Sequence, residues 1–63
     1  MKGYIIKTIN GEEIWNGTSW TPEMYATDRT IKVYPTLVGA QREVNQLNEE
    51  RPGMAGYLVV VEA

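Results

Sequence analysis

The segment from Thr36 to Glu50, TLVGAQREVNQLNEE, most constrains the fold, because it is the one stretch of the chain with a clear helical periodicity. Its apolar residues recur at offsets of three, four and three, and so share one helix face: Leu37, Ala40, Val44 and Leu47. Thr36 is suited to cap the first turn with its hydroxyl, and Pro52-Gly53 is suited to end the helix. We therefore expect a helix over about 36–50 with one buried face.

Two Asn-Gly dipeptides organise the chain before this helix. Residues 3–9, GYIIKTI, are rich in β-branched and aromatic side chains and lead into Asn10-Gly11, which is typical of a tight hairpin turn. A second dipeptide follows at 16–17. The spacing predicts a meander with strands at 3–9, 12–15 and 18–21, in which one turn can instead be a bulge or a looser loop.

Two-residue turns would place Ile6 opposite Trp15 and Glu13 opposite Trp20. One sheet face then carries Tyr4, Ile6, Thr8, Glu13, Trp15 and Trp20, and the other carries Ile5, Lys7, Ile9, Glu12, Ile14 and Ser19. Neither face is purely polar, and one helix covers one face. Either the tryptophans form the core under the helix and the isoleucine face (Ile5, Ile9 and Ile14) is exposed, or the reverse holds. Both arrangements leave an apolar surface of the kind that binds partners.

The remaining segments complete the expected sheet. Residues 21–30 read as a loop with a helical turn around 23–26, and 31–34 alternate as a short strand. The closing YLVVVE has five apolar residues in a row, which favours a strand covered on both faces. The expected fold class is α+β, with residues 1–63 as a single domain. It comprises a small antiparallel sheet of four to five short strands, the helix on one face, and the C-terminal strand central.

Composition excludes several chemistries. The chain has no cysteine and no histidine, so disulfides and the usual zinc ligands are absent. A chain of 63 residues buries only about 60% of its unfolded surface, and self-association is one way to complete such a small core. Residues 1–6 contain no apolar run of signal-peptide length, and no stretch is long enough to span a bilayer. We expect a cytoplasmic protein with no membrane association.

Catalysis has little support in the sequence. Adjacent carboxylates at Glu12-Glu13 and Glu49-Glu50 diverge in a strand or a helix, so neither pair forms a converging dyad. No phosphate-binding glycine motif is present. The net charge of −2 and the scattered cations do not form a basic footprint for nucleic acid. We expect a protein that is not an enzyme and that uses no cofactor and no metal.

The aromatic residues are the one constellation that suggests binding. All six carry a polar group, and tryptophan, tyrosine and arginine dominate interface energetics. The candidate partner-binding residues are Tyr4, Trp15, Trp20, Tyr25, Arg29 and Tyr34. The main hypothesis is a protein-binding module, an inhibitor or adaptor that acts as a homodimer or with a host protein. The alternative is a nucleic-acid-binding module that stacks bases on Trp15, Trp20 or Tyr25, with phosphates near Lys7, Lys32 and Arg29.

The order YIIKT, WNGTSW, IKVY, TLVGAQREVNQL and a valine-rich last strand resembles a loose class of very small proteins encoded by phages and other mobile elements. These share a β-β-β-helix-β layout over most of the chain. The chain departs from them at Val38 and Gly39, where the helix usually opens with a charged residue. The resemblance implies a protein that binds and blocks a host protein, including defence machinery, and it assigns no site residues.

Overall fold

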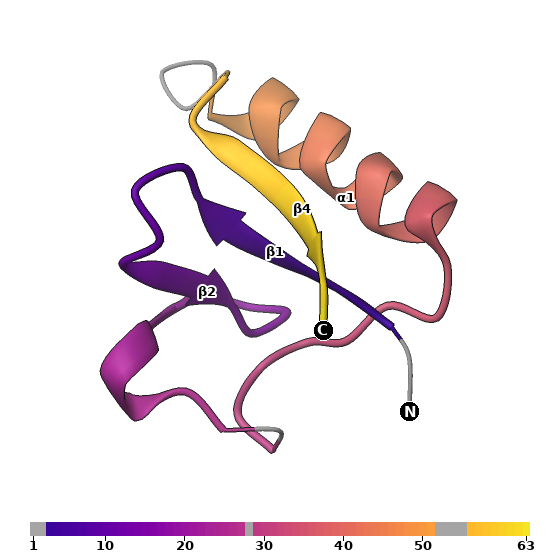
Figure 1. The fold of residues 1–63 in the computed structure, drawn as a ribbon. Coiled ribbons are helices and arrows are strands. Elements are labelled where there is room, and N and C mark those ends of the chain that lie inside the picture. The colour runs from indigo at the N-terminus through magenta and orange to yellow at the C-terminus, as the bar shows by residue number, and fades with distance from the viewer. Residues whose placement is uncertain (1–2, 28, 52–55) are drawn as a thin grey trace.

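The computed structural model describes residues 3–27, 29–51 and 56–63. Its elements in chain order are β1 (Tyr4–Thr8), β2 (Glu13–Trp15), β3 (Trp20–Pro22), the short 3₁₀ helix η1 (Glu23–Tyr25), α1 (Leu37–Glu50) and β4 (Leu58–Glu62). The strands form one antiparallel sheet in the order β3-β2-β1-β4, and α1 lies on one side of it (Figure 1). The predicted α+β layout is confirmed. Within the described ranges, no helix has the length and apolar character that a bilayer span requires.

The helix begins as the sequence predicts. The Thr36 hydroxyl accepts a hydrogen bond from the Gly39 N–H at 3.1 Å, which satisfies one of the free amides of the first turn. The buried face consists of Ala40, Val44 and Leu47. Leu37 was expected in this stripe but is 52% exposed, because it stands in the first turn at the margin of the stripe. The predicted helix exit at Pro52-Gly53 lies outside the described residues.

The first hairpin has the predicted register, since Lys7 pairs with Ile14, the register that sets Ile6 opposite Trp15. Its turn is looser than the expected two-residue type. Gly11 has a positive φ of 75°, whereas among the described residues no non-glycine residue does. The type I′ turn needs positive φ at both central positions, so Asn10-Gly11 does not form one.

The second register differs from the prediction. Trp15 pairs with Trp20, whereas Glu13 was expected opposite Trp20. The cause is the Asn16 side chain, whose oxygen accepts the N–H groups of Thr18 and Ser19 at 2.8 and 2.7 Å and so stabilises a longer loop. The register moves by two residues, which leaves every side chain on its predicted face.

The core lies between α1 and the face of the sheet that carries both tryptophans. Five buried residues form it: Ile6, Trp15, Val44, Leu47 and Leu58. Trp20, Tyr34 and Val60 pack against them. The Trp15 and Trp20 ring centroids lie 5.1 Å apart at an interplanar angle of 58°, a tilted geometry that aromatic pairs favour. The arrangement with the tryptophans under the helix is therefore the correct one.

The isoleucine face is not the exposed surface that we expected. Ile5 and Ile14 are buried, at 8% and 6% exposure, although Ile9 is 60% exposed. Neither buried isoleucine belongs to the core cluster under α1. An ion pair of 3.0 Å between Lys7, on this same face, and Glu23 joins β1 to the segment after β3. That segment contains η1, close to the predicted helical turn at 23–26.

Residues 31–34 do not form the predicted strand. Tyr34 makes a single bridge to Tyr4, in which each N–H donates to the other carbonyl at 2.8 Å. The Lys32 N–H donates to the Trp15 carbonyl at 3.1 Å. The segment meets only the start of β1 and the end of β2, because these two strands pair with each other beyond that point. Pairing is therefore too short to count as a strand.

The C-terminal strand β4 belongs to the sheet and pairs with β1 over its whole length, from Tyr4 with Glu62 to Thr8 with Leu58. We expected it to be central, but β1 and β2 hold the two inner positions and β4 the outer one. Val59, Val60 and Val61 are half-buried. An unbroken apolar run therefore arises here in a strand that, within the described ranges, is paired on one side.

Candidate functional site

The structure divides the six predicted binding residues into two groups. Trp15 is buried, and Tyr4, Trp20 and Tyr34 are half-buried. These four take part in the core or in the bridge beside it. Tyr25, 70% exposed, and Arg29, also exposed, lie on the segment between β3 and α1. The six residues therefore do not share one surface.

Tyr34 belongs to the segment between β3 and α1, and its side chain packs against the core. Burial raises the pKa of the Tyr34 phenol, and the negative charge of Glu43 on α1 raises it further. The Trp15 indole acts in the opposite direction on this pKa, but its buried N–H makes no full hydrogen bond among the described residues. Trp15 is therefore a neighbour of Tyr34 rather than its hydrogen-bond donor.

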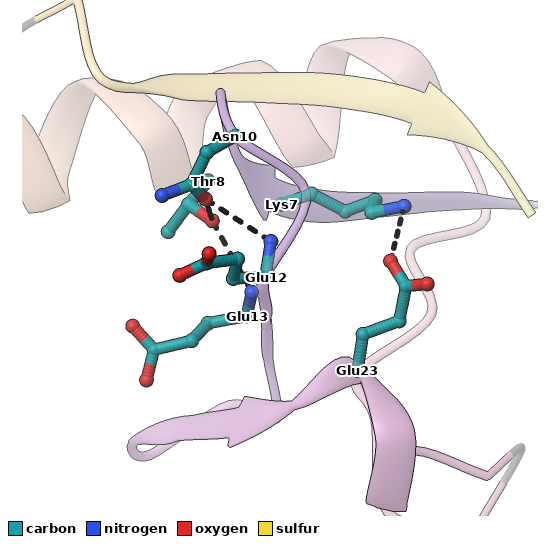
Figure 2. A network of polar contacts seen from close by, with 6 residues as sticks. All are labelled: Lys7, Thr8, Asn10, Glu12, Glu13 and Glu23. Carbon is teal, nitrogen blue, oxygen red and sulfur yellow. Dashed lines mark hydrogen bonds and ion pairs between the residues drawn. The ribbon is translucent and has the colours of Figure 1, made fainter.

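The turn between β1 and β2 holds a polar network (Figure 2). The hydroxyl of Thr8 donates to the Asn10 side-chain oxygen at 2.6 Å and accepts the Glu13 N–H at 3.2 Å. The Asn10 oxygen also accepts the Glu12 N–H at 3.0 Å. These bonds satisfy backbone and side-chain groups of the turn itself, so the network stabilises the hairpin.

A shallow hollow adjoins this turn, lined by Gly11, Glu12, Glu13, Pro22, Glu23 and Met24. Of its three carboxylates, the one on Glu23 is paired with Lys7. Across the described ranges, no cluster of three or more suitable side chains could hold a metal ion. The hollow thus has acidic character but no converging set of ligands.

The two edges of the sheet differ sharply. At one edge, β3 has three residues and ends at Pro22, which has no N–H to offer a neighbouring strand. At the other, β4 has five residues, LVVVE, without proline or lysine. Short strands, prolines and lysines are the usual devices that protect an edge from pairing. Within the described ranges, the β3 edge has two of these devices, whereas β4 has a single charged residue, Glu62, at its end.

Two hydrogen bonds fix which backbone groups of β4 point toward β1. The Ile9 N–H donates to the Tyr57 carbonyl at 2.7 Å, and the Ala63 N–H donates to the Gly3 carbonyl at 2.8 Å. Backbone bonds of an antiparallel pair recur at every second residue. The odd-numbered residues of β4 therefore direct their N–H and C=O groups to β1.

The even-numbered residues of β4 direct theirs away from the sheet. In the described part of the chain, no other strand pairs with this side of β4. The outward backbone donors and acceptors belong to Leu58, Val60 and Glu62. The aromatic pattern did not reveal this edge. The available sequence signal was a final apolar strand that lacks proline and lysine.

In comparisons with known proteins, no family model, no curated protein and no solved structure matches the chain. The likeness to small phage and mobile-element proteins thus stays a prediction.

Proposed function

We propose that this chain is a small non-catalytic protein-binding module that receives an extended segment of a partner at the free edge of β4. The proposed setting is the cytoplasm. An inhibitor role, which the resemblance to mobile-element proteins implies, would act through the same edge, and so would an adaptor role.

The open backbone of β4 carries the proposal. Strand addition obtains its affinity from main-chain hydrogen bonds and its selectivity from the side chains that flank them. Leu58, Val60 and Glu62 offer donors and acceptors in the required alternation. The strand is anchored along its whole length to β1 and is backed by α1, so it is already ordered before a partner arrives. A preordered edge lowers the entropic cost of binding.

The nucleic-acid alternative has less support. Base stacking requires exposed ring faces, whereas Trp15 is buried and Trp20 is half-buried in the core. Tyr25 is exposed, but of the cations named for phosphate contacts, Lys7 is engaged with Glu23. The protein-binding proposal needs neither tryptophan to move.

Amide exchange of the isotope-labelled chain tests the proposal. We would add a short synthetic peptide of alternating valine and threonine with lysine ends, which can pair as a strand through its backbone. We expect the amides of Leu58, Val60 and Glu62 to shift and to exchange more slowly, while the Trp20 amide at the other edge is unchanged. A matched peptide with methylated backbone nitrogens is the control and is expected to have no effect. Amides at β4 that exchange freely under every condition would refute the proposal.

A further inference from the structure

We propose that the partner of the β4 edge is a second copy of this chain, with two β4 strands paired antiparallel about a two-fold axis at Val60. This inference rests on the proposed function, because it names the occupant of the same edge. The result is one continuous eight-stranded sheet, twice the four strands of each copy, with both α1 helices on the same side.

The sequence of β4 is complementary to itself in this register. Val60 faces its own copy, and Leu58 faces Glu62 of the second chain. All three positions carry outward backbone groups, and each antiparallel pair exchanges two bonds, so about six interchain hydrogen bonds form. Glu62 is the only charged residue of β4, and it meets a leucine rather than another carboxylate. Like charges directly opposite each other would destabilise the pairing, and this register avoids them.

The position of α1 fits the same assembly. The helix packs against both β1 and β4, so its axis lies near the seam between these strands. Neighbouring strands are about 4.8 Å apart. A two-fold axis between two paired β4 strands lies half a strand spacing outside β4, and the seam lies half a spacing inside it. The seam is therefore about 4.8 Å from the axis, and the two helix axes are roughly 10 Å apart. Packed helices lie about 8–10 Å apart, so the helices touch without a clash or a gap.

The helix flank that faces the axis carries no charge. The negative charge of Glu43 raises the pKa of the Tyr34 phenol, so Glu43 lies on the same side of the helix as Tyr34. Tyr34 is bridged to Tyr4 on the β2 side of β1. The helix flank that carries Glu43 therefore faces away from β4. On the opposite flank, four residues fall within a sector of about 80°: Leu37, Gln41, Asn45 and Asn48.

Two observations on this flank point to a neighbour of the same kind. Leu37 is 52% exposed, although it is a large apolar side chain. Gln41 donates to Asn45 at 3.3 Å, and amide side chains can both donate to and accept from their own copies. An uncharged, self-compatible flank suits an isologous interface.

The other edge of the sheet limits the assembly to two chains. Pro22 and the three-residue length of β3 oppose strand addition there. The β4 edge is consumed by the two-fold pairing, so no edge remains open to a third chain. The expected assembly is a closed dimer rather than a fibre.

Sedimentation equilibrium of chemically synthesised chains tests this inference. We compare the unmodified chain with one methylated on the Val60 backbone nitrogen and one methylated on the Trp20 nitrogen. Val60 directs its N–H outward at the β4 edge. At the other edge, the Glu23 N–H donates to the Glu12 carbonyl, and backbone bonds between two antiparallel strands recur at every second residue. The Trp20 N–H therefore points outward from the β3 edge. Neither change removes a bond within one chain, and circular dichroism verifies that both chains fold.

The unmodified chain and the Trp20 control are expected at twice the mass of the 7.1 kDa chain. Methylation at Val60 removes two interchain bonds and blocks close approach, so the dissociation constant rises by roughly thirtyfold or more. A dimer insensitive to Val60 methylation would overturn the inference. So would a chain that stays monomeric from about 1 μM to about 1 mM. A monomer that still binds the test peptide at β4 would leave the proposed function standing.

A second pair of variants decides the matter if the Val60-methylated chain fails to fold. Gln41→Glu places a carboxylate on the flank that meets its own copy, and Gln46→Glu makes the same change outside that flank. Both positions are exposed. Gln41→Glu is expected to weaken the dimer about threefold or more at low salt, with recovery at high salt, whereas Gln46→Glu leaves it unchanged. Equal effects of the two changes would contradict the placement of the helices.

Discussion

Thr8→Val tests whether the buried hydroxyl in the first hairpin stabilises the fold. Thr8 is 2% exposed, and its hydroxyl both donates to Asn10 and accepts from the Glu13 N–H. Valine has nearly the same shape but neither bond. The change leaves the Glu13 N–H without this partner, in a part-buried position.

The expected loss follows from the bonds removed. Each hydrogen bond contributes about 1 kcal/mol net, and an unsatisfied buried group adds about 1–3 kcal/mol. Burial of the new methyl group offsets about 0.8 kcal/mol. The net destabilisation is about 2 kcal/mol, a large part of the roughly 3–9 kcal/mol that a domain of this size has. Tm should fall by about 4–8 °C for each kcal/mol.

Urea and thermal unfolding, followed by circular dichroism, measure this loss. Thr18→Val is the matched control, because Thr18 is exposed and its hydroxyl bonds no described residue. We expect the control to lie within about 0.5 kcal/mol of the original chain. If Thr8→Val were equally benign, the hydroxyl contacts in Figure 2 would contribute nothing to stability, and our account of the turn would be wrong.

Three further predictions concern the helix, the N-terminal strand and the phenol of the core. Thr36→Ala removes the helix cap and should cost about 1 kcal/mol in urea unfolding. Gly3→Ala adds a Cβ that collides with the Val33 side chain, so it should lower the free energy of unfolding by about 1–3 kcal/mol. If this variant melted at the same temperature as the original chain, the Val33 side chain would move aside without cost. The raised pKa of Tyr34 means that the unfolded chain loses this phenol proton first, so stability should fall as pH rises above 10.0, and Tyr34→Phe should reduce that fall. Glu43→Gln should bring the pKa of Tyr34 closer to its ordinary value in an absorbance titration.

Features fixed by local chemistry were predictable from sequence. The capping hydroxyl of Thr36 acts within one turn of the helix, so its role follows from neighbouring residues. The register of the first hairpin likewise follows from the spacing around Asn10-Gly11. The same dipeptide at 16–17 gave a wrong register, because the Asn16 side chain bonds to the loop amides and lengthens the turn. Identical dipeptides thus produce different turns when side-chain bonds compete with the ladder.

Features that depend on distant contacts were not predictable. Ile5 and Ile14 are buried on the face away from α1, although nothing in their own strands indicates which residues cover that face. The Lys7–Glu23 ion pair joins β1 to η1 without a recognisable pattern in the sequence. The aromatic candidates show the same effect, since Trp15 and Trp20 serve the core while the open edge is formed by backbone atoms.

The position of β4 was missed for a related reason. An apolar run reports that side chains on both faces are covered at least in part, but it carries no information about which strands lie beside it. Val59 and Val61 satisfy the pattern while half-buried at an outer strand. The same limit applies to any edge, because backbone pairing is independent of side-chain hydrophobicity.

The pairing of Tyr4 with Glu62 has a kinetic meaning as well as a structural one. The β1–β2 hairpin and α1 need only neighbouring residues and can form within microseconds. The β1–β4 ladder must instead close a loop that contains almost the whole described chain, which is slow and entropically costly. Until that closure, YIIKT in β1 has one side without its partner strand. The interval before β4 docks is therefore when this protein is most exposed to misassembly.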